Sequence, residues 1–153
     1  PQPAFDARPR LEQRQQLVVR GLEFRRRTQM NYLGLHLLVE FNDVAPTLLA
    51  DPLRLEEALR EAARAGGAHI LSGHFHHFGA HQGVTGVLLL RESHISLHTW
   101  PEFRYAAIDI FMCGDCRPES AVEILTDALD PGAVRHHTIK RGPTAGKSAR
   151  PPA

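Results

Sequence analysis

Along most of this chain, apolar residues recur with the period of a strand or of a helix. The segment LGLHLLVEF (33–41) alternates with a period of two, which places Leu37, Val39 and Phe41 on one side of a predicted strand. Further segments rich in apolar and β-branched residues predict more strands, at 68–77, 84–91, 94–100, 105–113 and, more weakly, 133–140.

Two segments carry the pattern of a helix. The stretch DPLRLEEALREAARAGG (51–67) begins with Asp51, which can cap a helix, and with Pro52 at the first helical position, and it ends in two glycines. Its apolar residues form one stripe, so this helix is expected to lie on a flat surface; the stripe comprises Leu55, Ala58, Leu59 and Ala62. A second helix is predicted from about Pro118 to Leu129.

This order of elements predicts an α+β fold, a two-layer sandwich with helices on one face of a mostly antiparallel sheet. Some apolar positions do not alternate cleanly with polar ones, which suggests that the second face of the sheet is covered as well. They are Val87, Leu88, Leu89, Leu90, Ile108 and Ile110. One domain of this size has no second helical layer, so we expect a homodimer that stacks its sheets.

Both ends of the chain differ in composition from the middle. Residues 1–29 hold seven arginines and no convincing start of a core element, which predicts a flexible, arginine-rich extension. A basic arm that binds nucleic acid or anionic lipid, and Met30 as the true initiator, are alternatives that the sequence leaves open. Residues 143–153 are expected to form a flexible tail, which leaves 30–142 as the single domain.

Composition and charge narrow the class of protein. The formal net charge is +1, so the overall balance does not point to a nucleic acid or to a membrane surface. No apolar stretch approaches the ~20 residues of a spanning helix, and no secretory signal pattern follows the N-terminus. Two cysteines make a poor disulfide framework, so a cytoplasmic location is expected.

The stretch RESHISLHTW (91–100) places a carboxylate, hydroxyls and imidazoles where core residues are expected. In a regular strand Ser93 and His98 face opposite sides and are five residues apart, so they could not meet along it. A serine–histidine nucleophile pair is therefore disfavoured, and no GxSxG motif is present.

Two other patterns are ambiguous. The segment HFHHFGAHQ (74–82) is rich in histidine, but its spacings fit no standard metal site, so no metal is expected; its histidines are His74, His76, His77 and His81. The segment CGDC places Cys113 and Cys116 in a CxxC pattern. That pattern can be a redox pair, or Cys113 can be a buried small hydrophobe, and the spacing does not decide between them.

The stretch GVTGVLLLRESHISLHTWPEFRYAAIDIFMCGD (83–115) resembles the signature of the bacterial and archaeal S-adenosylmethionine decarboxylase proenzymes. Its Glu-Ser-His, His-Thr-Trp-Pro-Glu and Cys-Gly pieces stand in that family's order and spacing, and LGLHLLVEF and HFHHF extend the likeness. The resemblance implies self-cleavage between Glu92 and Ser93, which leaves two chains, 1–92 and 93–153, and a pyruvoyl group derived from Ser93.

The resemblance also implies roles for individual side chains in the chemistry. His98 would be the base for self-cleavage, and Cys113 would donate a proton during decarboxylation. Thr85 stands where the family usually has serine, as the hydroxyl that stabilises the cleavage intermediate; its extra methyl group is expected to slow cleavage without abolishing it. Cys116 matches no role in the family.

Substrate contacts follow from the same resemblance. Glu102 would bind the ribose hydroxyls of S-adenosylmethionine, Phe78 would stack on its adenine, and Glu40 would belong to the same site. The sequence departs from the family in two places. The link after Phe78 is one residue longer, and Leu35 stands where a basic residue is common.

The implied activity is that of a lyase. S-adenosylmethionine would form a Schiff base with the pyruvoyl carbonyl, lose carbon dioxide and become the aminopropyl donor for spermidine, with neither a metal nor pyridoxal phosphate. Two alternatives stay open: a pyruvoyl-dependent ornithine or arginine decarboxylase of the same fold, and an uncleaved homologue that binds or regulates a partner. We expect a homodimer of two-chain protomers with a small-molecule substrate, and neither nucleic acid nor membrane as a partner.

Overall fold

The structure of this chain is a computed structural model that describes residues 32–142. The predictions for 1–29 and 143–153, and for Met30, lie outside the described residues. No helix within the described range is long and apolar enough to span a membrane.

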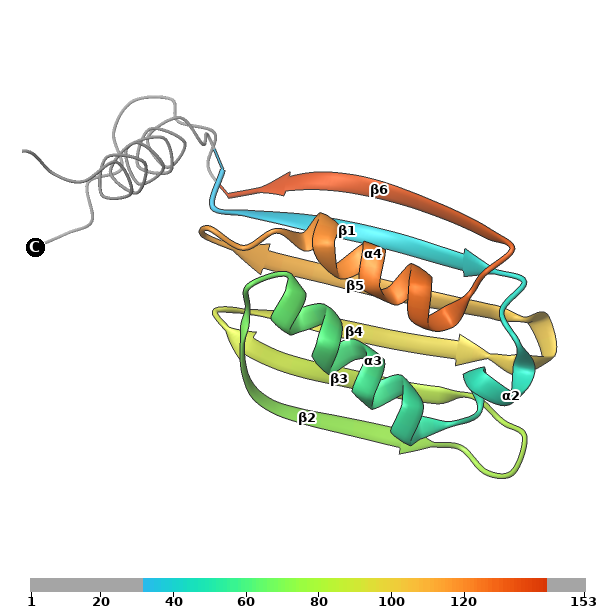
Figure 1. Cartoon of the computed structure of the whole chain (residues 1–153). Helices are drawn as coiled ribbons and strands as arrows, with labels where there is room; N and C mark the ends of the chain where they lie inside the picture. Colours follow the sequence, from blue (N-terminus) through green and yellow to red (C-terminus); the bar gives the residue numbers. More distant parts are fainter. Residues whose placement is uncertain (1–31, 143–153) are drawn as a thin grey trace, which may run out of the picture. The chain divides into compact units, whose positions relative to one another are not determined.

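The described part is a six-stranded sheet with helices packed on one face (Figure 1). In chain order the elements are β1 (Gly34–Asn42), α2 (Pro46–Leu49), α3 (Pro52–Ala65), β2 (His69–His77), β3 (Val84–Arg91), β4 (Ser93–Trp100), the 3-10 helix η1 (Pro101–Phe103), β5 (Tyr105–Cys113), α4 (Pro118–Leu129) and β6 (Ala133–Arg141). The strand order is β2-β3-β4-β5-β1-β6, and every neighbouring pair is antiparallel. The predicted α+β sandwich is therefore confirmed.

The ends of α3 are where the sequence predicts them. Asp51 Oδ1 accepts hydrogen bonds from the backbone N–H groups of Leu53 and Arg54, both at 3.1 Å. The helix stops at Gly66, and Gly67 adopts a φ of 79°, which favours glycine. The sequence did not predict α2 and η1, because elements of four and three residues are too short to show a hydrophobic period.

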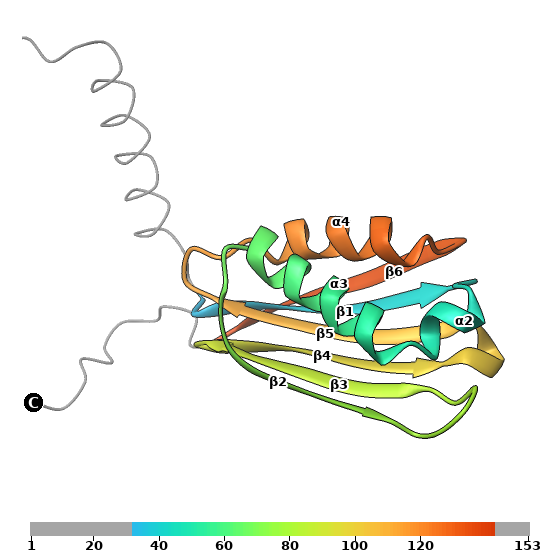
Figure 2. The same ribbon diagram turned by 60° about the horizontal axis from the view of Figure 1, so that its bottom comes forward.

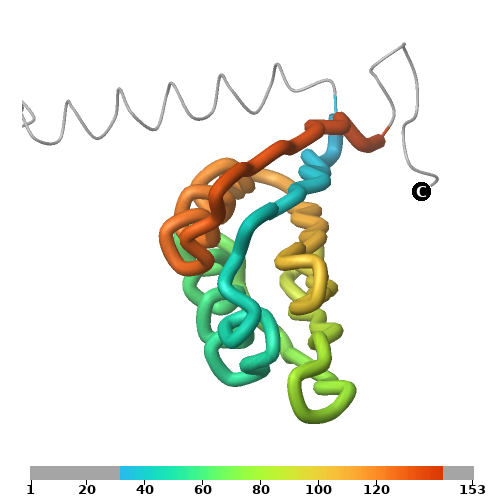
Figure 3. Tube along the Cα trace, turned by 90° about the vertical axis from the view of Figure 1, so that its right-hand side faces the viewer, coloured from blue at the N-terminus to red at the C-terminus, as the bar shows by residue number. Residues whose placement is uncertain are grey.

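The hydrophobic core lies between the sheet and the two long helices. Both α3 and α4 cover the same face of the sheet, and the two layers are seen from other directions in Figures 2 and 3. Leu37, Val39 and Phe41 alternate toward this layer and are at most 1% exposed. The predicted stripe of α3 belongs to the same core, since all four of its residues are buried.

The other face of the sheet, here called the open face, is less apolar than the sequence suggested. Leu88, Leu90, Ile108 and Ile110 all belong to the buried core on the helix side, and only Val87 and Leu89 of the six suspected positions alternate toward the open face. On the four inner strands that face comprises His36, Leu38 and Glu40 on β1, Thr85, Val87 and Leu89 on β3, His94, Ser96, His98 and Trp100 on β4, and Tyr105, Ala107, Asp109, Phe111 and Cys113 on β5.

Most of the open face is therefore polar or aromatic, and the expectation of a sheet that is apolar on both faces is wrong. The homodimer stays a prediction, but the composition of this face does not support it.

Thr99 joins three elements at one end of the sheet, and it is the buried polar side chain in the described part of the chain. Its hydroxyl donates to the carbonyl of Leu49 at the end of α2 (2.7 Å) and accepts from the N–H of Val84 (2.8 Å). The loop before β3 also packs closely against Thr99. A Cβ at Gly83 would lie 1.9 Å from the Thr99 carbonyl oxygen, so there is no room for a side chain at this position. These contacts fix the loop that precedes β3 against the end of β4.

We predict that Thr99→Val lowers the free energy of unfolding by about 2 kcal/mol, because it leaves a buried carbonyl and a buried N–H without partners. Urea denaturation measures the change. Thr138→Val on the exposed edge strand β6 is the matched control, expected within about 0.5 kcal/mol of the parent. Equal effects of the two substitutions would contradict this account of Thr99.

Candidate active site

The residues that the sequence singles out form two groups at opposite ends of the sheet. The first group lies around the end of β4 and comprises Glu40, Phe78, Thr85, His98 and Glu102. The second group lies where β3 turns into β4 and where β5 ends, and comprises Glu92, Ser93 and Cys113. They are called the pocket end and the hairpin end.

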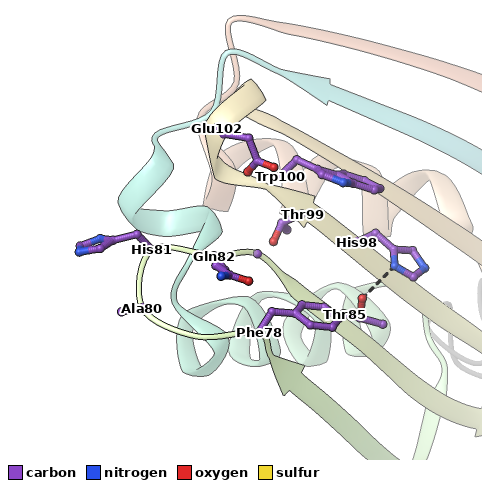
Figure 4. Close-up of a pocket in the computed structure, with 10 residues that line it drawn as sticks. Phe78, Ala80, His81, Gln82, Thr85, His98, Thr99, Trp100 and Glu102 are labelled. Carbon is purple, nitrogen blue, oxygen red and sulfur yellow. Dashed lines mark hydrogen bonds between the residues drawn. The ribbon is translucent and has the colours of Figure 1, made fainter.

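A cavity of about 650 Å³ occupies the pocket end (Figure 4). Its walls come from the loop between β2 and β3, from the ends of β3 and β4, and from η1. Phe78 is 56% exposed and Trp100 is 37% exposed, so both rings offer aromatic surface to a ligand. Glu102 on η1 adds a carboxylate to the same wall. The cavity can thus hold a flat ring together with hydroxyl or cationic groups.

Thr85 and His98 both line this cavity and contact each other. They are directly opposite each other on β3 and β4, and Thr85 Oγ1 is hydrogen-bonded to His98 Nδ1 at 3.0 Å (Figure 4). When Nδ1 carries no proton, the hydroxyl donates this bond and the imidazole can accept a proton. The two side chains to which the resemblance gives the hydroxyl and base roles are therefore in direct contact.

Glu40 lies in the same row of the sheet. Ala107 is opposite both His98 and Glu40, so only one small residue separates the imidazole from the carboxylate. Glu40 accepts a hydrogen bond from the hydroxyl of Tyr105, whose ring stacks on Trp100 with centroids 5.4 Å apart. Burial, followed by the bond to Glu40, raises the pKa of Tyr105 to about 12.

Tyr105 is a site residue that the sequence reasoning missed. Trp100 and Tyr105 are a cross-strand pair on either side of a short turn. Aromatic residues that flank a turn between two strands are a usual cross-strand pair, and this pattern was the available signal.

At the hairpin end, Arg91 and Glu92 separate Leu90 from Ser93, which are paired across β3 and β4. Glu92 is exposed, whereas Ser93 is half-buried. The Ser93 hydroxyl oxygen is buried and has no hydrogen-bond partner among residues 32–142. A buried hydroxyl without a partner is unfavourable by about 1–3 kcal/mol, so it is unusual for a residue with only a structural role.

Cys113 ends β5 beside this turn. Burial, together with the carboxylate of Glu92, raises the pKa of the Cys113 thiol. Gly34, its partner on β1, leaves room for the thiol, since a Cβ there would lie 3.0 Å from Sγ. Burial also raises the pKa of Cys116, which contacts the carbonyl of Gly67 at 3.7 Å. Both cysteines are free thiols, and both are protonated at neutral pH.

The histidine-rich segment does not form a metal site in the described part of the chain. His74 and His76 lie on β2 opposite Val87 and Thr85, and His76 contacts the ring of Phe78 edge-on at 4.8 Å. No group of three or more histidine, cysteine, aspartate or glutamate residues within 32–142 is arranged to hold a metal ion.

The pocket end and the hairpin end are far apart within one chain. Strand β4 runs without a register shift against β3 and β5 from Ser93 to Trp100. Ser93 and His98 are five residues apart, which corresponds to roughly 17 Å along a strand. An imidazole cannot cover that distance, so His98 cannot act on Ser93 of its own chain in this fold.

Comparison with known proteins gives one consistent family. A family model described as S-adenosylmethionine decarboxylase matches residues 35–142. The S-adenosylmethionine decarboxylase proenzyme of Methanococcus aeolicus is 44% identical over 114 residues, 74% of this chain and 97% of the relative. The proenzyme of Pyrococcus furiosus is 38% identical over 114 residues, 74% of this chain and 81% of the relative. The crystal structure of the adenosylmethionine decarboxylase from Aquifex aeolicus superposes with a TM-score of 0.69 and 31% identity, covering 78% of this chain and 98% of that one.

The raised thiol pKa of Cys113 gives a prediction that does not depend on catalysis. A higher pKa means less thiolate at a given pH, so alkylation by iodoacetamide should be slow at pH 7.5 and should accelerate with a midpoint above the ordinary value of about 8.5. The rate is measured on Cys116→Ser, which leaves Cys113 as the reacting thiol, and in urea as the unfolded reference. A midpoint at or below that of the unfolded chain would contradict the burial of this thiol.

Proposed function

The chain belongs to the S-adenosylmethionine decarboxylase family, and from that premise we propose that it is a lyase that removes the carboxyl group of S-adenosylmethionine with a pyruvoyl group made from its own Ser93. The observation that carries this proposal is the Ser93 hydroxyl, which directly follows Glu92 at the turn from β3 to β4 and is buried without a hydrogen-bond partner in the part of the chain that the structure describes.

Self-cleavage begins with attack of Ser93 Oγ on the carbonyl carbon of Glu92. The acyl group moves from nitrogen to oxygen, and the peptide bond becomes an ester. A base then removes the α-proton of residue 93, and Glu92 leaves as a carboxylate. Hydrolysis of the remaining dehydroalanine releases ammonia and leaves a pyruvoyl end on the chain 93–153. A hydroxyl that is not engaged in a hydrogen bond is free to make this attack.

The base for this step comes from a second copy of the chain. His98 and Thr85 are hydrogen-bonded to each other but are too far from Ser93 of the same chain, by the length of β4. If Ser93 and His98 have the roles that the family resemblance gives them, Ser93 of one protomer must meet His98 of the other. The proposed homodimer therefore rests on the distance between Ser93 and His98.

A two-fold stack of open faces satisfies this requirement. The two-fold axis would lie between the two facing sheets, perpendicular to the strands and midway between Ser93 and His98. Rotation about this axis makes the strands of the second protomer run opposite to those of the first. It then brings the hairpin end of one protomer over the pocket end of the other. Leu89 and Ile139 are 50% and 43% exposed on this side of the sheet and would be covered by the stack.

In decarboxylation the residues of both ends have separate tasks. A pyruvoyl carbonyl supplies an electron sink for the electrons left by the departing carboxylate. Cys113 holds a thiol proton at neutral pH, which it can deliver to the α-carbon of the substrate. Phe78 would stack on the adenine and Glu102 would accept hydrogen bonds from the ribose hydroxyls. Glu40, in the same row of the sheet as His98, would complete the binding site.

The pocket favours S-adenosylmethionine over the alternative substrates. Ornithine and arginine are short aliphatic amino acids that need no aromatic walls, whereas a cavity of about 650 Å³ lined by Phe78 and Trp100 suits an adenosyl group. The product would be the aminopropyl donor for spermidine synthesis in the cytoplasm. Neither a metal nor pyridoxal phosphate takes part in this scheme.

Cleavage tests the proposal directly. The purified parent should run as two fragments on a denaturing gel and should release carbon dioxide from S-adenosylmethionine, but not from ornithine or arginine. Ser93→Ala should remain one inactive chain, because the nucleophile is absent. Ser96→Ala on the same strand is the matched control and should be cleaved like the parent. An uncleaved parent, or release from ornithine or arginine instead, would overturn the proposal.

Mixed dimers test the exchange of residues between subunits. His98→Ala alone should stay intact, because it has Ser93 but no base. When it is co-expressed with differently tagged Ser93→Ala, the His98→Ala chain should be cleaved, since the partner supplies His98, while the Ser93→Ala chain stays whole. Failure of cleavage in a purified heterodimer would show that each chain processes itself.

A further inference from the structure

Tyr105 does not line the cavity at the pocket end, yet it holds two groups that belong to that site. We propose that Tyr105 is a positioning residue, which fixes Trp100 as a wall of the substrate pocket and ties it to the carboxylate of Glu40. This inference rests on the proposed function for its kinetic consequence, but its structural part can be measured without any activity.

One side of Tyr105 supports the tryptophan. The two rings lie 5.4 Å apart between centroids and 28° from parallel, which is a stacked arrangement. Trp100 is 37% exposed and has His98 as its other aromatic neighbour, with centroids 6.1 Å apart and planes inclined at 35°. Of these two ring contacts, the one with Tyr105 is the closer and the more nearly parallel, so Tyr105 is the better-placed support for the indole.

The hydroxyl of Tyr105 anchors the opposite end of the ring. It donates a hydrogen bond to Glu40 Oε2 on β1, 65 residues away in the chain. Ala107 lies opposite Glu40 in register, and its methyl group leaves space on the open face for the tyrosine ring to reach the carboxylate. The ring is thus held at both ends, by the stack and by the hydrogen bond.

The anchor remains in place throughout the physiological pH range. The pKa of Tyr105 is raised to about 12, first by burial and then by Glu40 and Asp109, against an opposing effect of Arg135. A phenol with this pKa keeps its proton and continues to donate to Glu40 at any pH at which the enzyme would work.

The kinetic test compares Tyr105→Phe with Tyr32→Phe. Tyr32 is the other tyrosine of the chain and lies under Lys140, so its substitution is a matched control. Tyr105→Phe keeps the stacking ring but loses the anchor. We expect KM for S-adenosylmethionine to rise roughly three- to tenfold, with kcat within about twofold and cleavage unchanged, because one charge-assisted hydrogen bond acts on binding alone. An unchanged KM, or a loss confined to kcat, would overturn the positioning role.

The second test uses Trp100 as a probe, since it is the single tryptophan of the chain. In the uncleaved Ser93→Ala background, Tyr105→Phe should lower the fluorescence anisotropy of Trp100 and increase its quenching by iodide, whereas Tyr32→Phe should change neither. Glu40→Ala should reproduce the effect of Tyr105→Phe, and Glu40→Gln, which keeps an acceptor oxygen, should restore most of the parent signal.

The double variant Glu40→Ala/Tyr105→Phe should show the same Trp100 anisotropy and iodide quenching as either single variant, because both substitutions remove the same hydrogen bond. Additive effects, or an anisotropy equal to that of the parent in both single variants, would refute the inference. A parent that releases no carbon dioxide from S-adenosylmethionine would refute the proposed function alone, since the fluorescence comparison does not require turnover.

Discussion

The alternation of side chains along an antiparallel sheet is the constraint on which this structure depends. Every second residue of β3, β4, β5 and β1 packs under α3 and α4, and the residues between them form the open face. All the predicted catalytic groups except Ser93 and Glu92, which lie at the turn, belong to that face. The regular rise of β4 then fixes how far apart they are. The separation of Ser93 from His98 follows from an undistorted strand, and the proposed contribution of a second subunit to self-cleavage rests on it.

The pocket end is held by contacts on both sides of the sheet. On the helix side, the hydroxyl of Thr99 connects α2 to the start of β3. On the open face, Trp100, Tyr105 and Glu40 connect β4, β5 and β1. Thr99 and Trp100 are consecutive residues, so the two sets of contacts meet at the end of one strand. We infer that this rigidity allows an exposed cavity wall to keep a defined shape.

The sequence predicted those strands and helices that show a hydrophobic period or carry capping residues at their ends. The strands and the two long helices lie within two residues of their expected bounds, because Asp51, the glycines after α3 and the alternation of β1 are local signals. It erred where a run of apolar residues hid the alternation of β3, so that Leu88 and Leu90 could not be assigned to a face. The hydrogen bond between Tyr105 and Glu40 could not be predicted from the sequence, because it depends on the register of strands that are distant in the sequence. The family resemblance supplied roles for Ser93, His98 and Cys113, while their placement at opposite ends needed the fold.

The central claim is that residue 93 changes its chemical identity. Intact-mass and peptide mass spectrometry of purified protein, on a sample shown to release carbon dioxide from S-adenosylmethionine, tests it most directly. The account predicts a fragment that begins at position 93 with a ketoacyl end lacking the serine nitrogen, together with a fragment that ends in the free carboxyl group of Glu92. An active sample in which an unmodified Ser93 is still bonded to Glu92 would contradict it.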